Sequence, residues 1–292
     1  MKKRNRNRLV VVLLSDLHAG HKLGLLNPDT PLMDEHATPY CPSLNTTQRY
    51  LYNLYLAHIE QVADLADGCP VILDVNGDIT HGAHYAEHLS LVSVADQITA
   101  AAWDLCPWYT HPRIRLTHVR IIVGTAAHSW EGSAEPLVAN QLSQMYPKID
   151  TRPLYHLQQK FTSQNDQVID LAHHGPFPGS RKWLEGSIAR RYLISAMMDE
   201  IVDGVAPPIL YARAHYHQYV HVGPERIRQN GHDIESSLVI TPSYSGIDDY
   251  VRQATRSKGK IDHGLVALEF NGGLGEVYPF YQELDIRTKE EL

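Results

Sequence analysis

Five short apolar runs in this sequence each lead into an aspartate or a histidine, and this recurrence constrains the fold most. The runs have the Val, Ile and Leu content of buried strands. They cover residues 9–14, 71–75, 119–123, 168 onward, and 209–212. The acids and histidines that follow them are Asp16, His18, Asp78, His128, His173, His174, His215 and His217. Because ligands of α/β proteins collect outside the carboxyl ends of the strands, we expect these side chains to meet at one site.

Helical patterns alternate with these runs. Residues 45–67 present one apolar face, with Asn45 or Thr46 as the N-terminal cap and with Gly68 and Pro70 at the end. Further helices are expected over residues 84–105, 133–146 and about 181–202. Strands that alternate with helices predict a largely parallel core sheet.

The pattern changes in the C-terminal part of the chain, residues 236–292. Short β-type runs cover 238–241, 264–270 and 276–280, and the last two are joined by Asn271-Gly272-Gly273, a hairpin signal. We expect this β-rich extension to add antiparallel strands to a second sheet. The fold class is therefore α/β, a sandwich of two sheets with helices outside. Residues 1–8 are expected to be a basic tail and residues 9–292 a single domain, in which residues 20–44 form a long loop beside the site.

Composition narrows the setting and the partners. The net charge of −7 disfavours a general polyanion-binding surface, although five of the first eight residues are basic. No apolar run approaches the length of a membrane span, and we expect no membrane partner. The three cysteines, Cys41, Cys69 and Cys106, lack CxxC spacing, which is typical of reduced thiols and predicts a cytoplasmic protein.

Aspartate and histidine together suit Zn, Mn or Fe, because they combine hard oxygen and borderline nitrogen ligands. Asp78, which follows Gly77, is the natural bridge between two such ions. Asp16 and His18 with one histidine of the 215/217 pair would complete one metal site. His174 with the other histidine of that pair would bind the second metal. Two metals about 3.5–4 Å apart clamp a phosphoryl group and convert a water between them to hydroxide. An imidazolium beside the leaving oxygen then serves as the general acid.

These blocks, taken in order, resemble the motifs of the calcineurin-like metallophosphoesterases, which read D-x-H, G-D, G-N-H-D/E, H-G and G-H-x-H. The corresponding segments are Asp16-Leu17-His18, Gly77-Asp78, an altered third block, His174-Gly175 and Ala214-His215-Tyr216-His217. The resemblance covers about residues 9–220 and extends into the β-rich tail. It implies a four-layer α/β/β/α sandwich of two mixed sheets, a dinuclear centre of divalent ions (Mn, Zn or Fe), and hydrolysis of phosphate esters. The metal ligands that it implies are Asp16, His18, Asp78, His174, His215 and His217. In that arrangement Asp78 bridges, His217 joins Asp16 and His18, and His215 joins His174.

The third block departs from the family pattern, because Gly124-Thr125-Ala126-Ala127-His128 lacks the ligating Asn. His128 is then either the catalytic histidine displaced by two residues or a replacement metal ligand, and we favour the catalytic role. A third alternative is a second metal that binds loosely with a water-filled position. For the fourth block we favour His174 over His173 because His174 lies beside Gly175.

The substrate is expected to be a phosphodiester, either a nucleic acid or a nucleotide. Family members that dephosphorylate proteins resemble G-D-x-V-D-R-G and G-N-H-E, whereas this chain has Gly77-Asp78-Ile79-Thr80-His81-Gly82. It is thus similar to the short, non-protein-phosphatase type. His81, Arg181 and Lys182 are candidate substrate contacts. A separate zinc site at His81, His84 and His88 is less favoured than exposed helix histidines. The alternatives are a phosphomonoesterase and a binding or scaffold protein that lost the chemistry. The sequence leaves the oligomeric state open.

Overall fold

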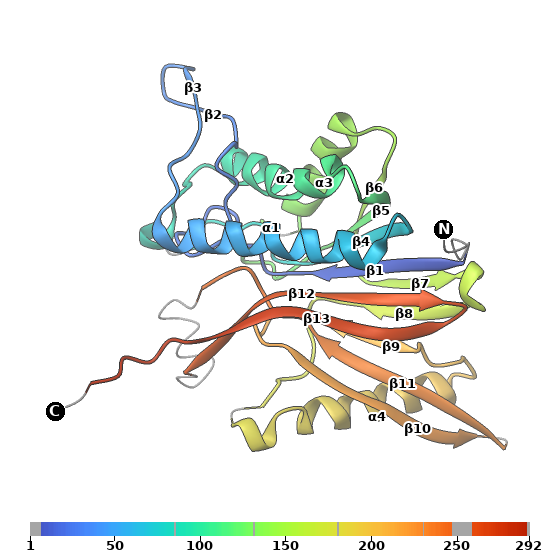
Figure 1. Cartoon of the computed structure of the whole chain (residues 1–292). Coiled ribbons are helices and arrows are strands. Elements are labelled where there is room, and N and C mark those ends of the chain that lie inside the picture. Colours follow the sequence, from blue (N-terminus) through green and yellow to red (C-terminus); the bar gives the residue numbers. More distant parts are fainter. Residues whose placement is uncertain are drawn as a thin grey trace.

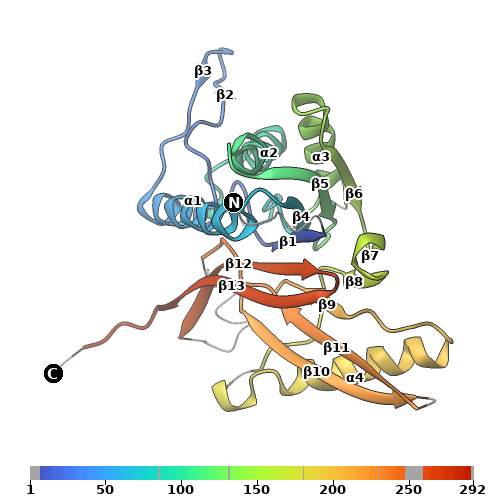
Figure 2. The same ribbon diagram turned by 45° about the vertical axis from the view of Figure 1, so that its right-hand side comes forward.

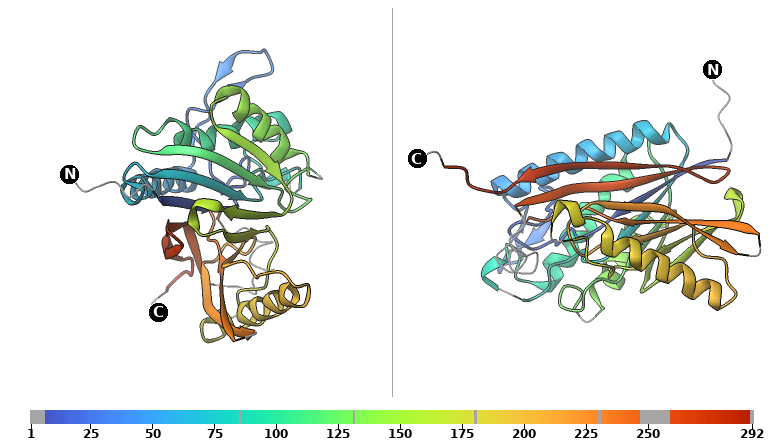
Figure 3. Two further views of the ribbon diagram at one scale, coloured as in Figure 1. Left: turned by 90° about the vertical axis from the view of Figure 1, so that its right-hand side faces the viewer. Right: turned by 90° about the horizontal axis from the view of Figure 1, so that it is seen from below.

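Two β-sheets lie face to face, and helices cover the outer side of each (Figures 1 and 2). The structure is a computed structural model and describes residues 7–84, 86–130, 132–179, 181–229, 231–246 and 259–290. Figure 3 shows the stack from two further directions. The α/β/β/α sandwich predicted from the sequence is confirmed.

The first sheet has the strand order β13-β12-β1-β4-β5-β6. Its parallel strands are β1 (Arg8–Leu14), β4 (Pro70–Asn76), β5 (Arg115–Ile122) and β6 (Asp150–Leu154). The antiparallel hairpin β12 (Lys260–Asn271) and β13 (Leu274–Asp285) adds to β1. The carboxyl ends of β1, β4 and β5 therefore lie at one edge of this sheet.

The second sheet has the order β10-β11-β9-β8-β7. Its strands are β7 (Leu157–Phe161), β8 (Gln167–Leu171), β9 (Leu210–Arg213), β10 (Val220–Gln229) and β11 (His232–Ile240). Strands β8, β9 and β11 are parallel to one another, and β7 and β10 pair antiparallel to β8 and β11 at the two edges. Both sheets are thus mixed.

The C-terminal hairpin corrects one expectation. The sequence predicted that the tail extends the second sheet, but only β11 belongs there, and β12 and β13 extend the first sheet. Strand β12 is buried along most of its length, because helix α1 (Thr46–Ala66) covers one face and the second sheet covers the other. Leu9 of β1 pairs with Phe270 of β12 in the register that places Phe270 between the sheets.

The other helices are α2 (Val94–Thr110), α3 (Ala134–Met145) and α4 (Ser187–Val202). Helices α1, α2 and α3 lie on the first sheet, and α4 lies on the second (Figure 1). Two expected starts were wrong. Helix α2 begins at 94, not 84, because Ser93 caps it and the preceding segment forms the short 3-10 helix η1 (Ala86–His88). Helix α4 begins at 187, not 181, after η3 (Lys182–Leu184) and Gly186.

Each interface between layers has its own apolar core. Along β1, Val10, Val12 and Leu14 face the helices. Leu9, Val11 and Leu13 on the same strand face the second sheet. A third core lies between α4 and the second sheet. Because both faces of β1 are buried, its sequence is a continuous apolar run without polar alternation.

The long loop between β1 and α1 divides into two parts. Its first part is packed into the body, where Leu25 and Leu26 are buried. The strands β2 (Leu32–Met33) and β3 (Pro39–Tyr40) then form a hairpin that stands away from the helices (Figures 1 and 2). Within the described residues, no helix is both long and apolar enough to cross a membrane.

Candidate metal centre

The loops that follow β1 and β4 are joined by backbone hydrogen bonds beyond the ends of the strands. The Asp16 N–H donates to the Gly77 carbonyl at 3.1 Å, and the His18 N–H donates to the Asp78 carbonyl at 3.0 Å. The His215 N–H, from the loop after β9, donates to Asp16 Oδ2 at 3.2 Å. Both sheets therefore deliver polar side chains to one place.

The backbone at this place is strained. Ten non-glycine residues in the described part of the chain have a positive φ, and five of them are predicted site residues: Asp16, His18, Asp78, His215 and His217. The left-handed region costs a non-glycine residue about 1–3 kcal/mol and persists only where the surrounding structure imposes it. Such a concentration is typical of functional sites.

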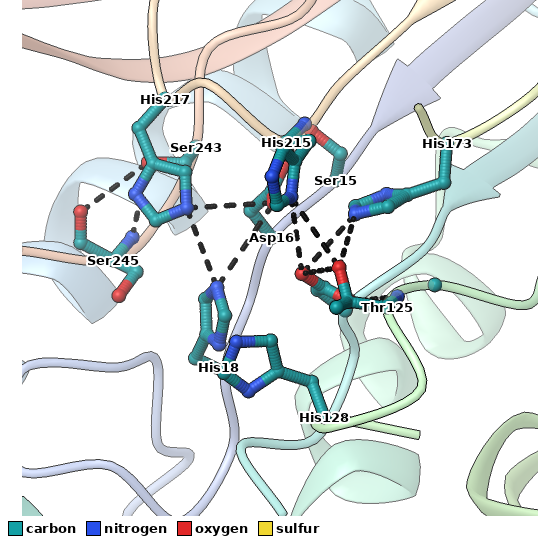
Figure 4. Close-up of polar contacts among 12 residues, drawn as sticks. Ser15, Asp16, His18, Thr125, His128, His173, His215, His217, Ser243 and Ser245 are labelled. Carbon is teal, nitrogen blue, oxygen red and sulfur yellow. Dashed lines mark hydrogen bonds and ion pairs between the residues drawn. The ribbon is translucent and has the colours of Figure 1, made fainter. Parts of the chain in front are cut away.

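The first group of donors contains Asp16, His18 and His217, all buried, with one ligand atom from each within 4.8 Å of the others. His217 Nε2 lies 3.4 Å from Asp16 Oδ1 and 3.3 Å from His18 Nε2 (Figure 4). Asp16 Oδ1 is buried and accepts no hydrogen bond from any described residue. Nitrogen and oxygen ligands of one cation, at about 2.0–2.2 Å from it, stand roughly 3–3.5 Å apart. Two of the three separations in this group match that range, and the third, between His18 Nε2 and Asp16 Oδ1, is 4.0 Å. The group could therefore hold a divalent cation.

The second group lies around Asp78. His173 Nε2 is 3.1 Å from Asp78 Oδ2, and His215 Nδ1 is 3.9 Å from the same oxygen. His173, His174 and His215 place one ring nitrogen each within 4.8 Å of one another, and Asp16, Asp78 and His173 form an overlapping group. Asp78 thus lies where the two groups meet, as expected of a bridge, and its role as a ligand stays a prediction.

His173 and His174 are both within this second group, but their environments differ. His173 is buried, and its Nδ1–H donates to the Asn76 carbonyl at 2.7 Å, which turns Nε2 toward Asp78. A side chain at Gly77, which has φ +85°, would overlap the His173 ring. His174 is exposed and has Nε2 at 3.4 Å from Thr125 Oγ1. The sequence favoured His174 as the ligand. The structure places His173 in the same group of donors and brings it next to Asp78.

The pKa values of the buried residues are shifted in different directions in the two groups. Burial lowers the pKa of His18 well below its usual value, and His128 lowers it further. Burial also acts to lower the pKa of His173, but the Asp78 carboxylate outweighs it and raises that pKa to about 9. Burial acts to raise the pKa of Asp78, yet the adjacent His173 holds it well below its usual range. The site therefore contains ionised Asp78 among imidazoles of different basicity.

Thr125 is a site residue that the sequence reasoning did not select. Its N–H donates to Asp78 Oδ1 at 2.6 Å, and its hydroxyl lies 3.2 Å from Asp78 Oδ2. The same hydroxyl lies near the rings of His173 and His215 (Figure 4). The only sequence signal was its position, since it occupies the place of the missing Asn in the altered third block.

His128 lies on the other side, next to His18. Their ring centroids are 4.6 Å apart, and His128 Nδ1 lies 2.6 Å from the His81 carbonyl oxygen. Ring nitrogens of His18, His81 and His128 are all within 4.8 Å of one another. His81 is buried, with its ring centroid 4.3 Å from that of His21. The predicted catalytic and substrate-contacting histidines therefore lie against the first group of donors.

The remaining candidates are peripheral. Arg181 and Lys182 are exposed at η3, and their role as substrate contacts stays a prediction. His84 is exposed. The rings of His81 and His88 both lie near His21, at 4.3 and 5.8 Å between centroids. Neither His84 nor His88 belongs to any of the potential metal-binding groups found among the described residues.

Comparison with known protein families and with curated proteins finds no match for this chain. Among solved structures, the chain is similar to the sulfate thiohydrolase SoxB of Thermus thermophilus, determined in complex with glycerol. The two are 11% identical, with a TM-score of 0.38. The match covers 95% of this chain and 56% of SoxB, so this chain spans little more than half the length of that protein. What the site can do follows from its own geometry.

Proposed function

We propose that this chain is a metal-dependent phosphoesterase that hydrolyses a phosphodiester at a centre of two divalent cations. The observation that carries the proposal is the pair of adjoining donor groups, Asp16 with His18 and His217, and Asp78 with His173, His174 and His215. The motif order that resembles the calcineurin-like metallophosphoesterases supports the same activity. Two cations held there would polarise a phosphoryl group and lower the pKa of a water to supply the nucleophile.

The protein's own residues have separate tasks in this proposal. The first group and Asp78 would hold the cations that bind the substrate phosphate, and the burial of these residues excludes water from that side. His128 moves the proton. Its Nδ1–H donates to the His81 carbonyl, so Nε2 is the ring nitrogen that remains available to the substrate. In its protonated form His128 then donates that proton to the leaving oxygen.

A diester is the proposed substrate class, and a nucleic acid or nucleotide is its proposed source. The Gly77-Asp78-Ile79-Thr80-His81-Gly82 block supports this proposal, because it lacks the arginine of the protein-phosphatase motif. His81, which lies against His18 and His128, is the proposed substrate contact closest to the chemistry.

Hydrolysis of two chromogenic esters in the presence of Mn²⁺ tests the proposal. We expect the wild-type chain to hydrolyse bis-p-nitrophenyl phosphate faster than p-nitrophenyl phosphate. His217→Ala should lose about 100-fold or more of this rate together with bound metal, because it removes a ligand. His232→Ala, an exposed histidine at the start of β11, is the matched control and should change neither. Two bound cations without turnover of either ester would contradict the proposal and favour a binding protein.

A further inference from the structure

The hydroxyl of Thr125 lies at nearly equal distances from four polar atoms of the second group. These are Asp78 Oδ2 at 3.2 Å, His215 Nδ1 at 3.3 Å, and Nε2 of His173 and of His174 at 3.4 Å each. A threonine hydroxyl donates one hydrogen bond and accepts at most two, so it cannot satisfy four neighbours. Hydrogen bonding alone therefore does not explain this arrangement.

The same distances are those between ligands of one cation. When nitrogen and oxygen ligands surround an ion tetrahedrally at about 2.0–2.1 Å, neighbouring ligand atoms stand about 3.3 Å apart. The separations from Thr125 Oγ1 to Asp78 Oδ2, His215 Nδ1 and His173 Nε2 fall within about 0.1 Å of that value, and three is the number of neighbours that one vertex of a tetrahedron has. The hydroxyl thus occupies one vertex of a coordination polyhedron whose other vertices are carboxylate oxygen and imidazole nitrogen.

The backbone holds Thr125 in this position. Its N–H donates to Asp78 Oδ1 at 2.6 Å, which leaves Asp78 Oδ2 on the side of the hydroxyl. The preceding Gly124 has no room for a side chain, because a Cβ there would overlap Asp78. Its N–H donates to Glu135 Oε1 of α3 at 3.2 Å. The loop after β5 is therefore fixed by contacts on both sides of the residue.

We infer that the Thr125 hydroxyl is a ligand of the second cation and replaces the amide that the altered third block lacks. The inference rests on the two-cation centre proposed above. It assigns the second cation to Asp78, His173, His215 and Thr125, with the exposed His174 on the solvent side. A neutral hydroxyl is a hard oxygen ligand, which favours Mn²⁺ or Zn²⁺ over softer ions.

Cation binding to the metal-free full-length chain tests this assignment. Mn²⁺ titration by calorimetry, with metal content measured after dialysis, should give two equivalents for the wild type and for Thr125→Ser. Thr125→Val keeps the shape but removes the hydroxyl, and we expect the second affinity to fall about tenfold or more. The Mn²⁺ EPR spectrum should change with it, from that of a coupled pair to that of an isolated ion. Thr117→Val, on strand β5, is the matched control for loss of a threonine hydroxyl and should bind like the wild type.

The outcomes separate the two proposals. Two equivalents with unchanged affinities in Thr125→Val would overturn the ligand assignment and leave the two-cation centre intact. A wild-type chain that binds no Mn²⁺ or Zn²⁺ would overturn both. If the valine variant does not fold, Thr125→Ala, which adds no branched side chain, replaces it in the same titration, and the same comparison with Thr125→Ser decides.

Discussion

At the scale of single residues, a contact with the His81 backbone carbonyl determines which ring nitrogen of His128 can take part in chemistry. The sequence left it open whether His128 is the general acid or a metal ligand. Its Nδ1 is committed to the His81 carbonyl at 2.6 Å, and its ring meets that of His18 edge-on. Because Nδ1 is the hydrogen-bond donor, Nε2 of His128 is the nitrogen available to a substrate bound beside the first group of donors.

His128→Ala separates the two roles. We expect the variant to retain two equivalents of metal while the rate of diester hydrolysis falls about 10²–10⁴-fold, because general acid catalysis contributes that much. The measurement is metal content and kcat on the same preparation. The exposed His84→Ala should leave both unchanged. Loss of one metal equivalent from His128→Ala would show that His128 is a ligand.

The choice between His173 and His174 could not be made from the sequence. Both follow β8 directly, and the glycine beside His174 was the only local signal. What distinguishes them is the Asn76 carbonyl, which belongs to β4 in the other sheet and binds His173. That contact joins residues far apart in the chain, and no local pattern contains it.

At the scale of elements, the ends of the strands carry most of what the sequence could predict about the site. Asp16, His18, Asp78, His215 and His217 were all expected beyond strand ends, and all lie there. Thr125 was not selected, because a threonine after a strand is common and its hydroxyl gains meaning only beside Asp78. The turn between β4 and Asp78 depends on Gly77, whose missing side chain admits the His173 ring.

Gly77→Ala should therefore damage the site through the turn. A methyl group there would overlap the ring of His173 and would also be strained at φ +85°. We expect loss of the second metal equivalent and a lower free energy of unfolding, measured by dialysis and by urea denaturation. Gly204→Ala is the matched control, because its φ is +75° but no atom lies within 4 Å of the added Cβ. Equal effects of the two variants would mean that strain alone matters and that the contact with His173 does not.

The starts of two helices were the least predictable elements. A helix was expected from residue 84, yet the Ser90 and Leu91 N–H groups donate to the Gly20 carbonyl in the loop after β1. Tertiary contacts override propensity at such a place. Helix α4 starts late because Gly186, with φ +76°, precedes it in the left-handed conformation.

At the scale of the whole molecule, the four layers could be predicted, but the partition of strands between the sheets could not. The order of strands and helices along the chain indicates a parallel core and does not say which sheet a late strand joins. Strand β12 of the C-terminal hairpin pairs with β1, from the opposite end of the chain, through residues such as Val11 and Leu268. The apolar composition of β12 predicted only that this strand would be buried.

The division of the strands between two sheets determines where the candidate metal centre lies. The first sheet supplies Asp16, His18, Asp78 and Thr125 from the ends of its strands, and the second supplies His173, His174, His215 and His217 from the loops after β8 and β9. The apolar core between the sheets packs together the two sheets that carry these donors. A centre that needs both sheets can form only after they have packed together.

Anomalous scattering from a crystal of the wild-type chain soaked in Mn²⁺ tests the two-cation centre most directly. Two peaks are expected, about 3.5–4 Å apart, with Asp78 between them. One peak should lie within bonding distance of Asp16, His18 and His217, and the other within bonding distance of His173, His215 and the Thr125 hydroxyl. A single peak among His18, His81 and His128, or no peak at either donor group, would contradict the account.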